Sequence, residues 1–245
     1  MTLGRRAVAE GVGTALLVAT VVGSGIMGDR LSGGNTAIAL LANTLATGAA
    51  LIALILTFGP ISGAHFNPVV TLADASQRGL PWTSVPAYLL AQIAGAVGGA
   101  GLANVMFGLP VFQFSTHART GGPQFLSEVV ATFGLLGVIW GCVRHRSHAV
   151  AYAVAAYISA AYWFTPSTSF ANPAVTLARS LTDTFAGIRP ADVGGFVLAQ
   201  VIGAAGATLL FRWLAPPPAI AAADMIGSTA QTGEGASQSR VRLPS

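Results

Sequence analysis

The sequence predicts an all-α membrane protein in which six spanning helices and two re-entrant half-helices form an inverted repeat. Charged residues make up only 8% of the 245-residue chain, whereas a soluble domain carries about a quarter. The hydrophobic residues gather in long segments that suit spanning helices. A short Asn-Pro segment also occurs twice, once in each half of the chain. We therefore expect the chain to lie in a lipid bilayer.

Six apolar segments are long enough, or nearly so, to cross a bilayer, which takes roughly 20 residues. They cover residues 7–28, 36–58, 82–107, 123–142, 149–164 and 191–214. The fifth is short, and an extension at either end is expected. The third and sixth carry small residues four positions apart, which let helices approach closely in lipid. These are Ala91, Gly95, Gly99, Ala199, Gly203 and Ala207.

The two halves of this region, residues 1–110 and 121–214, repeat each other. The segment that starts at Asn67 reads Asn-Pro-Val-Val-Thr-Leu-Ala, and the one that starts at Asn172 reads Asn-Pro-Ala-Val-Thr-Leu-Ala. Polar residues within the apolar segments pair in the same way, Glu10 with Glu128 and Gln92 with Gln200. Each half holds three spans, an odd number, so the second half enters the membrane from the opposite side. Such inverted repeats carry their functional site near the midplane.

The basic residues, all arginine, predict the orientation of the chain. More of them fall on one side of the six-span arrangement than on the other: Arg5, Arg6, Arg78, Arg144, Arg146 and Arg212 against Arg30, Arg119, Arg179 and Arg189. The positive-inside rule then places both termini in the cytoplasm. The sequence has no basic patch with interleaved aromatic residues, so nothing in it indicates nucleic acid as a partner. We expect residues 1–214 to form one channel domain and 215–245 to be a disordered tail.

Each Asn-Pro segment predicts a short helix, because Asn is a favoured N-cap and proline suits the first turn. The pairs are Asn67 with Pro68 and Asn172 with Pro173. The alternative, two surface turns, fits poorly with the apolar residues that follow. Two such helices entering from opposite faces would meet at their N-termini, each of which carries about half a positive charge. The side-chain amides would donate to a passing oxygen, so the pattern predicts a pore for neutral molecules that rejects protons.

Two loops resemble the signature loops of the aquaporin and glycerol-facilitator family, the major intrinsic proteins. They read Ser-Gly-Ala-His-Phe-Asn-Pro-Val from Ser62 and Ser-Phe-Ala-Asn-Pro-Ala from Ser169. The resemblance covers about residues 5–214 and implies a pore in each subunit of a homotetramer. Val69 stands where the family has alanine in the first motif, whereas Ala174 in the second motif follows the pattern.

The resemblance also implies a selectivity filter, and this chain departs from the family there. Most members carry arginine three residues after the second Asn, where this chain has Val175. Arg179, one helical turn further on, is not expected to substitute. The implied filter positions are Thr47, Ala160, Ser169 and Val175. Without a large or charged member, this ring predicts a wide, neutral constriction with two hydroxyls.

The run from Tyr162 to Thr176, together with Thr47, resembles a bacterial subgroup associated with arsenic-resistance operons. That resemblance implies a multi-pass protein of the bacterial plasma membrane that conducts arsenite, as neutral As(OH)3, and methylated arsenicals. The residues themselves predict a neutral, polyhydroxylated solute larger than water. A general glycerol or water facilitator is the nearest alternative. A secondary transporter also uses inverted repeats and broken helices, and saturable, proton-coupled uptake would favour it.

Glu10 and Glu128 lie inside apolar segments, where an acid is a functional candidate by default. We favour a structural role, in which they accept hydrogen bonds from the backbone of the re-entrant loops. Gln92 and Gln200 are expected to act with them, and His65 to lie close to the pore. The sequence holds no metal-ligand cluster, no phosphate-binding loop and no nucleophile with a base. It therefore predicts no catalytic residues, no enzyme activity and no metal or cofactor.

Overall fold

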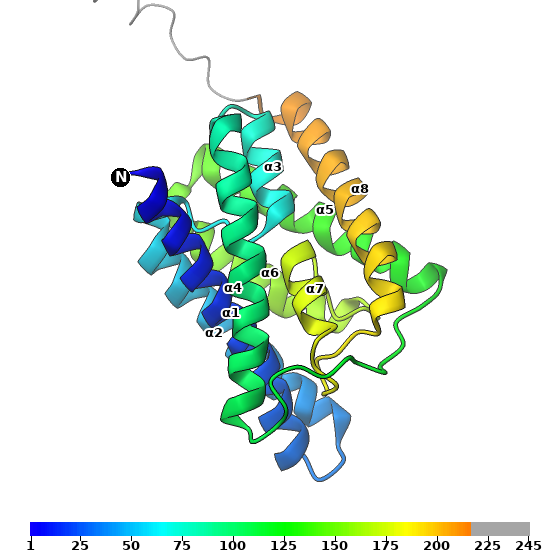
Figure 1. Ribbon diagram of the computed structural model, residues 1–245. Helices are drawn as coiled ribbons and strands as arrows, with labels where there is room; N and C mark the ends of the chain where they lie inside the picture. Colours follow the sequence, from blue (N-terminus) through cyan, green and yellow to red (C-terminus); the bar gives the residue numbers. More distant parts are fainter. Residues whose placement is uncertain (217–245) are drawn as a thin grey trace, which may run out of the picture. The chain divides into compact units, whose positions relative to one another are not determined.

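The computed structural model describes residues 1–216, and within that range the chain folds into eight α-helices (Figure 1). No strand occurs among these residues. The helices are α1 (Leu3–Leu31), α2 (Thr36–Ser62), α3 (Pro68–Ser76), α4 (Val85–Met106), α5 (Gly122–His145), α6 (Val150–Phe164), α7 (Pro173–Arg179) and α8 (Pro190–Leu214). Residues 1–215 form one compact unit. The predicted disordered tail, from residue 217 on, lies outside the described residues.

Five helices of the described region are long and apolar enough to cross a membrane: α1, α2, α5, α8, and α4 with the turn before it. The remaining predicted segment, the fifth in chain order, is α6, whose 15 residues span about 22 Å at 1.5 Å per residue. A 3₁₀ turn, Ser147–Ala149, extends it at its N-terminal end. With α3 and α7 as the two short helices, the predicted all-α fold class is confirmed.

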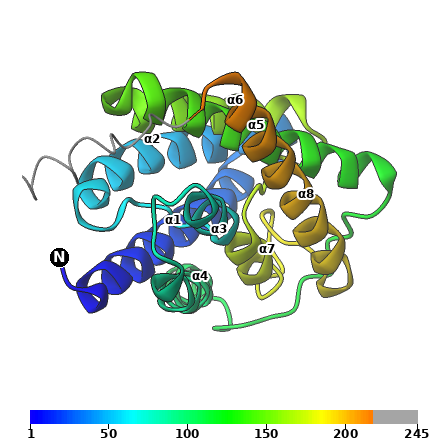
Figure 2. The ribbon, with the colours of Figure 1, turned by 90° about the horizontal axis from the view of Figure 1, so that it is seen from above.

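The long helices pack as two similar pairs, α1 with α4 and α5 with α8 (Figure 2). Glycine at the crossing points lets the backbones touch. A Cβ atom at Gly95 would collide with the carbonyl of Gly11, and one at Gly203 would collide with the carbonyl of Val129. In lipid such close contact replaces the hydrophobic force that drives packing in water. The two glycines hold equivalent positions in the repeat, which explains why the pairs resemble each other.

The half-helices α3 and α7 lie between these two pairs (Figure 2). They run in opposite directions from their starts at the middle of the bundle (Figure 1). The C-terminus of α3 lies beside that of α8, where Arg212 donates to the Ser76 carbonyl (2.9 Å). The C-terminus of α7 meets the loop 107–121, where the Ser115 amide donates to the Ser180 carbonyl (3.0 Å). We call these two ends of the bundle the α3 end and the α7 end.

Candidate functional site

The site is built from the N-termini of α3 and α7, which are capped as the sequence predicts. Asn67 Oδ1 accepts from the Val69 amide (3.1 Å). Asn172 Oδ1 accepts from the amides of Ala174 (3.0 Å) and Val175 (3.3 Å). The prolines that follow, Pro68 and Pro173, occupy the first helical turn, where no amide hydrogen is needed. The caps fix the side-chain oxygens toward the helices, so the amide nitrogens point away from them.

The two asparagines also tie the loops to each other, which the sequence did not predict. Asn67 Nδ2 donates to the Ala171 carbonyl and Asn172 Nδ2 donates to the Phe66 carbonyl, each at 2.8 Å. Each amide nitrogen carries two hydrogens, so one hydrogen remains after this bond. Both asparagines line the same cavity. The remaining hydrogens are the groups that a solute in the cavity would meet.

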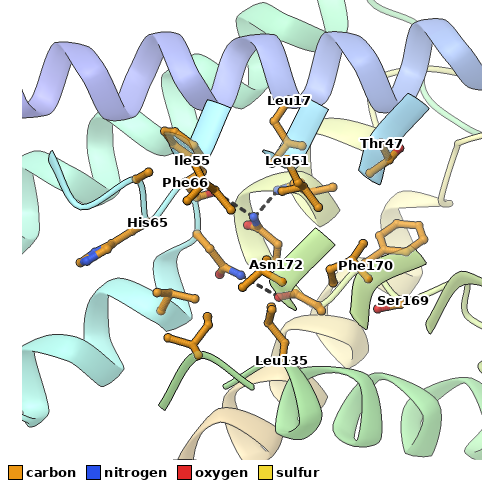
Figure 3. A pocket seen from close by; sticks show the side chains of 18 of the residues that line it. Leu17, Thr47, Leu51, Ile55, His65, Phe66, Leu135, Ser169, Phe170 and Asn172 are labelled. Atoms are coloured by element: carbon orange, nitrogen blue, oxygen red, sulfur yellow. Dashed lines mark hydrogen bonds between the residues drawn. The ribbon is translucent and has the colours of Figure 1, made fainter. Parts of the chain in front are cut away.

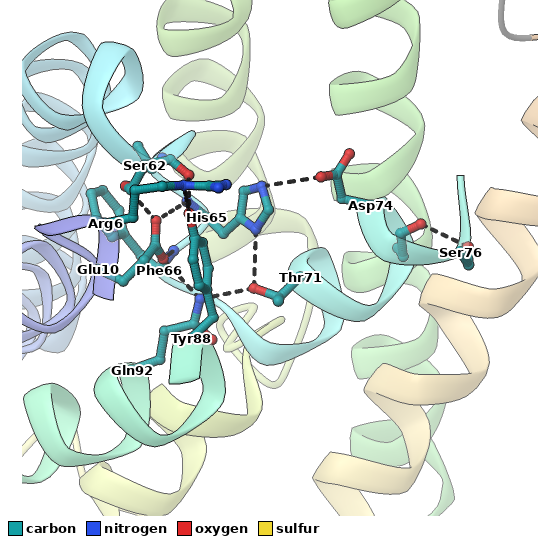
Figure 4. A network of polar contacts seen from close by, with 12 residues as sticks. Arg6, Glu10, Ser62, His65, Phe66, Thr71, Asp74, Ser76, Tyr88 and Gln92 are labelled. Carbon is teal, nitrogen blue, oxygen red and sulfur yellow. Dashed lines mark hydrogen bonds and ion pairs between the residues drawn. The ribbon is translucent and has the colours of Figure 1, made fainter. Parts of the chain in front are cut away.

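The loop before each asparagine is held by a buried carboxylate. Glu10 accepts from the amides of His65 (2.9 Å) and Phe66 (2.7 Å) (Figure 4). Glu128 accepts from the amides of Phe170 (2.9 Å) and Ala171 (2.9 Å). Both glutamates are fully buried. Each therefore supplies hydrogen-bond partners to backbone amides that have no helix to satisfy them.

Two glutamines connect these carboxylates to the half-helices. Gln92 donates from Nε2 to Glu10 (2.8 Å) and to the Thr71 hydroxyl (2.9 Å). Gln200 donates from Nε2 to Glu128 (2.7 Å) and to the Thr176 hydroxyl (2.8 Å). In each repeat the glutamine Nε2 thus bonds both the glutamate that supports the loop and the threonine on the half-helix. A glutamate, a glutamine and a threonine thus form one connected network in each repeat, as is usual for buried polar groups.

The supported loops hold a backbone conformation that side chains rarely adopt. Ala64 and Phe66 in the first loop have φ of 49° and 51°, and Ser169 and Ala171 in the second have φ of 50° and 49°. A non-glycine residue in this left-handed region costs about 1–2 kcal/mol. Such strain persists only where the surroundings over-determine it, and here the carboxylates and the asparagine ties do so. The strain turns the Phe66 and Ala171 carbonyls toward the asparagines.

The cavity between the half-helices has a volume of about 170 Å³. At 10–15 Å³ of accessible volume for each water, it has room for on the order of ten water-sized molecules. Its walls are mostly apolar and include Leu17, Leu51, Leu135 and Val154. Figure 3 shows His65 at one end, Thr47, Ser169 and Phe170 at the other, and Asn172 between them. A small solute would therefore meet few polar groups besides those at the centre and the ends.

Three of the four predicted filter residues lie together at the α7 end of this cavity. Thr47, Ser169 and Val175 line it and are each at most 5% exposed. The Thr47 hydroxyl lies 3.3 Å from the Tyr162 hydroxyl. The Ser169 hydroxyl has no hydrogen-bond partner among the described residues. It is therefore a buried polar group whose bonding capacity is left for the cavity.

The fourth assignment, Ala160, is wrong. Its side chain is exposed on the outer face of α6, whereas Ile158 and Tyr162 of the same helix line the cavity. Residues four apart share a helix face, and a residue two positions from both points to the other side. The expectation that nothing large lies at this end is therefore also wrong, because Tyr162 is a bulky aromatic residue with a hydroxyl.

The α7 end is charged as well, contrary to the expected neutral constriction. Arg179 lines the cavity one turn beyond Val175. Arg119, which the sequence suggested only as a topology signal, and Arg179, which was not expected to substitute for the filter arginine, are buried at 8% and 2% exposure. Nearby in the loop 107–121, burial lowers the pKa of His117, and the charges of Arg119 and Arg179 lower it further. His117 is thus neutral near pH 7, and the arginines carry the positive charge here.

The α3 end holds a different set of groups around His65 (Figure 4). His65 Nδ1 lies 3.1 Å from the Thr71 hydroxyl, and His65 Nε2 lies 3.6 Å from Asp74 Oδ2. His65 and Asp74 both line the cavity. Asp74 was missed at the sequence level. The signal was present, because Asp74 lies seven residues after Asn67 on α3, as Arg179 lies seven after Asn172 on α7.

Comparison with known proteins places this geometry in a family. Residues 1–149 match the pattern of the family described as major intrinsic protein. A protein from Rhizobium meliloti (strain 1021) named aquaglyceroporin AqpS is 55% identical over 215 residues, which cover 88% of this chain and 92% of that protein. Aquaporin NIP1-1 of Zea mays is 42% identical over 96 residues, 38% of this chain and 34% of its own length.

A solved structure supports the fold. The X-ray structure of the aquaglyceroporin from Plasmodium falciparum superposes with a TM-score of 0.67, covering 86% of this chain and 96% of that one. At 19% identity the match speaks for the arrangement of helices alone. The family pattern and the Rhizobium relative add similarity at the level of the sequence. The chain is therefore a multi-pass membrane protein that belongs to the major intrinsic protein family.

Proposed function

We propose that this chain is a passive channel for small uncharged solutes that carry hydroxyl groups. The observation that carries the proposal is the pair of tied asparagines in the apolar cavity. Asn67 and Asn172 each keep one amide hydrogen for a solute oxygen, while most of the residues that line the cavity are apolar. Few, fixed donors on an apolar wall bind a solute weakly enough to let it leave, which conduction requires.

We propose glycerol-like polyols, arsenite and methylated arsenicals as solutes, with water as a further candidate. As(OH)3 is neutral at pH 7 and resembles glycerol in presenting several hydroxyls. Donors and acceptors for such a molecule are present in Thr47, Ser169 and the two asparagines. The name of the Rhizobium relative, aquaglyceroporin, supports the polyol part of the proposal. A general glycerol or water facilitator without a role in arsenic export is the alternative.

Protons are expected to be excluded at the centre of the cavity. An oxygen that accepts from both asparagines must turn its own hydrogens away from the neighbouring oxygens. A chain of waters would be interrupted at this point, so protons could not hop along it. The partial positive charges at the starts of α3 and α7 add a barrier to hydronium.

We place the protein in a bacterial plasma membrane, with the channel domain at residues 1–214 and both termini in the cytoplasm. Large apolar side chains are exposed around the bundle, among them Leu45, Leu90, Leu126, Leu198 and Leu209. Such a surface suits contact with lipid and with neighbouring subunits. It is consistent with a homotetramer in which each subunit has its own pore.

A secondary transporter is the alternative from another class. Coupling to protons would require an acid that exchanges them with the solute pathway. Glu10 and Glu128 support the two asparagine loops, and the oxygens of both bond loop amides and glutamines. Asp74, the acid that lines the cavity, lies near the C-terminus of α3, where it is 3.6 Å from His65. Members of this family are channels rather than enzymes or pumps, which also favours a passive pore.

Proteoliposomes that contain the purified protein provide the test. Swelling on exposure to water and glycerol gradients, and uptake of arsenite, should exceed that of empty liposomes and should grow linearly with the gradient. An imposed pH gradient should leave glycerol and arsenite flux unchanged. Saturable uptake driven by the pH gradient would identify a transporter, and flux of water alone would refute the proposed solutes.

A further inference from the structure

The two ends of the cavity carry opposite charges at equivalent positions of the repeat. The residue seven positions after the first Asn is Asp74, and the residue seven positions after the second is Arg179. Both line the cavity. The residues two positions before each Asn differ as well, His65 in one loop and Phe170 in the other. The scaffold is thus symmetric, while its charge runs from an acid at the α3 end to a guanidinium at the α7 end.

Arg179 is held at the cavity by the geometry of α7. Side chains on a helix lean toward its N-terminus, and residues four apart share a face. Arg179 therefore lies on the same face of α7 as Val175, and both residues line the cavity. The Nε atom donates to the Ala186 carbonyl, and the guanidinium lies 3.4 Å from the centre of the Phe170 ring. These contacts restrict the position of its charge.

A second positive charge accompanies Arg179. Arg119 donates from Nε to the Gly187 carbonyl (2.9 Å) and from Nη1 to the Ser167 carbonyl (3.1 Å). Its guanidinium also lies over Phe170, at 5.0 Å from the ring centre. Neither arginine forms a salt bridge within the described residues. Carbonyls and an aromatic face are therefore the direct partners of the two guanidinium groups, and no acid forms an ion pair with either within the described residues.

The α7 end also keeps hydrogen-bonding capacity for a solute. Within the described residues the Arg179 side chain donates a single hydrogen bond, from Nε, so its two terminal nitrogens keep their four hydrogens. The Ser169 hydroxyl, 3% exposed, has no partner and lines the same space. A neutral solute with several oxygens could accept from Arg179 and donate to or accept from Ser169. A cation would meet the same guanidinium and be repelled.

We propose that Arg179 is the charged element of the selectivity filter in this chain, replacing the arginine that is absent at position 175. Its terminal N–H groups donate hydrogen bonds to an oxygen of a neutral polyhydroxylated solute, and its charge repels cations at the α7 end. This inference rests on the proposed channel function, because it concerns the same cavity. It also explains how a filter with valine at position 175 can retain a barrier to cations.

The test compares sodium leak with glycerol flux in proteoliposomes. Arg179→Met keeps an unbranched apolar stem but removes the guanidinium and its charge, whereas Arg179→Lys keeps a positive charge. Arg30→Met is the matched control, since Arg30 also lies at the α7 end, donates to a carbonyl (3.0 Å) and covers Phe107, yet does not line the cavity. We expect ²²Na⁺ uptake to rise about tenfold in Arg179→Met alone.

Moving the charge provides a rescue. The double variant Arg179→Met with Val175→Arg should return sodium leak to the wild-type level. If Arg179→Met does not yield folded protein, Arg179→Gln takes its place, because its amide can still donate to the Ala186 carbonyl. Wild-type sodium leak in a folded Arg179 variant that lacks the charge would overturn the proposal, and so would an equal rise in Arg30→Met.

The two proposals can fail separately. If wild-type protein conducts neither glycerol nor arsenite, the proposed solutes are wrong, while sodium leak in the Arg179 variants still decides the role of this residue. If glycerol passes and Arg179→Met leaves the sodium leak unchanged, the channel function stands and the assignment of Arg179 fails.

Discussion

The α3 and α7 loops share one scaffold and differ in what they present to the cavity. In both, a buried glutamate accepts from two loop amides, one of which belongs to a strained residue, Phe66 or Ala171. A glutamine joins the glutamate to a threonine, and an asparagine caps the helix and ties it to the other loop. Asp74 with His65 lies at one end, and Arg179 with Phe170 lies at the other. The backbone is thus set by residues behind the cavity, which leaves the positions that face it free to diverge in charge.

The largest effect on the shared scaffold is expected from removal of one of the two buried carboxylates. Glu10→Ala and Glu128→Ala should each lower the free energy of unfolding by about 3 kcal/mol or more, because at least two backbone amides and a glutamine lose a charged acceptor. Thermal unfolding in detergent measures the loss. Glu10→Gln and Glu128→Gln keep the shape and should cost less. A large loss in one repeat and none in the other would show that the two loops are not supported alike.

Added volume at the two helix crossings behind the loops should lower the stability of the protein equally in both repeats. Gly95→Ala and Gly203→Ala each place a Cβ against a backbone carbonyl of the partner helix. Overpacking of this kind typically costs about 1–3 kcal/mol. Gly98→Ala is the control, since nothing lies within 4 Å of its Cβ position. Thermal unfolding of the three variants in detergent separates the steric effect from a general effect of alanine. A Gly95→Ala variant as stable as wild type would contradict the close contact of α1 with α4.

Selectivity should change most at the α7 end. Val175→Arg adds a second guanidinium beside that of Arg179 and narrows the space, so glycerol flux should fall about tenfold while water flux falls less. Val175→Met fills volume without adding charge and serves as the control. Shrinkage of proteoliposomes in hyperosmotic sucrose gives the water flux, and reswelling in hyperosmotic glycerol gives the glycerol flux. Equal losses for water and glycerol would contradict the filter position of Val175.

The smallest effect is expected at the α3 end. Asp74→Asn removes a carboxylate whose side chain is 25% exposed and which lies 3.6 Å from His65. Partly exposed pairs contribute at most about 1 kcal/mol, so the free energy of unfolding should change by less than that. Glycerol flux and sodium leak should stay near wild type. A rise in sodium leak as large as that of Arg179→Met would mean that both ends control the passage of ions.

Much of the scaffold followed from the sequence because it depends on local chemistry and on repetition. Apolar length predicted the spans, and the Asn-Pro pairs predicted the starts of α3 and α7. The recurrence of Glu10 at Glu128 indicated a shared structural task. The ties between the asparagines and the opposite loops did not follow, because the accepting carbonyls of Phe66 and Ala171 belong to the backbone and leave no mark on residue identity.

The α7 end was the least predictable part of the site. Ala160 was assigned by counting back through a loop, and a shift of two residues turns a helix position to the opposite face. Arg179 was set aside because it follows Val175 by one turn, although that spacing keeps both on one face. The burial of Arg119 depends on how the loop 107–121 folds inward. Such a loop has no periodicity from which its path could be inferred.

The ties between Asn67 and Ala171 and between Asn172 and Phe66 have a consequence for biosynthesis. The partners of each bond lie more than one hundred residues apart in the chain, at separations of 104 and 106. When the ribosome has delivered the first three spans to the membrane, the first loop still lacks the carbonyl that its asparagine requires. Its final shape must therefore wait until the second half has been synthesised and inserted. A nascent chain truncated before residue 171 would expose an incomplete pore to the quality-control machinery of the cell.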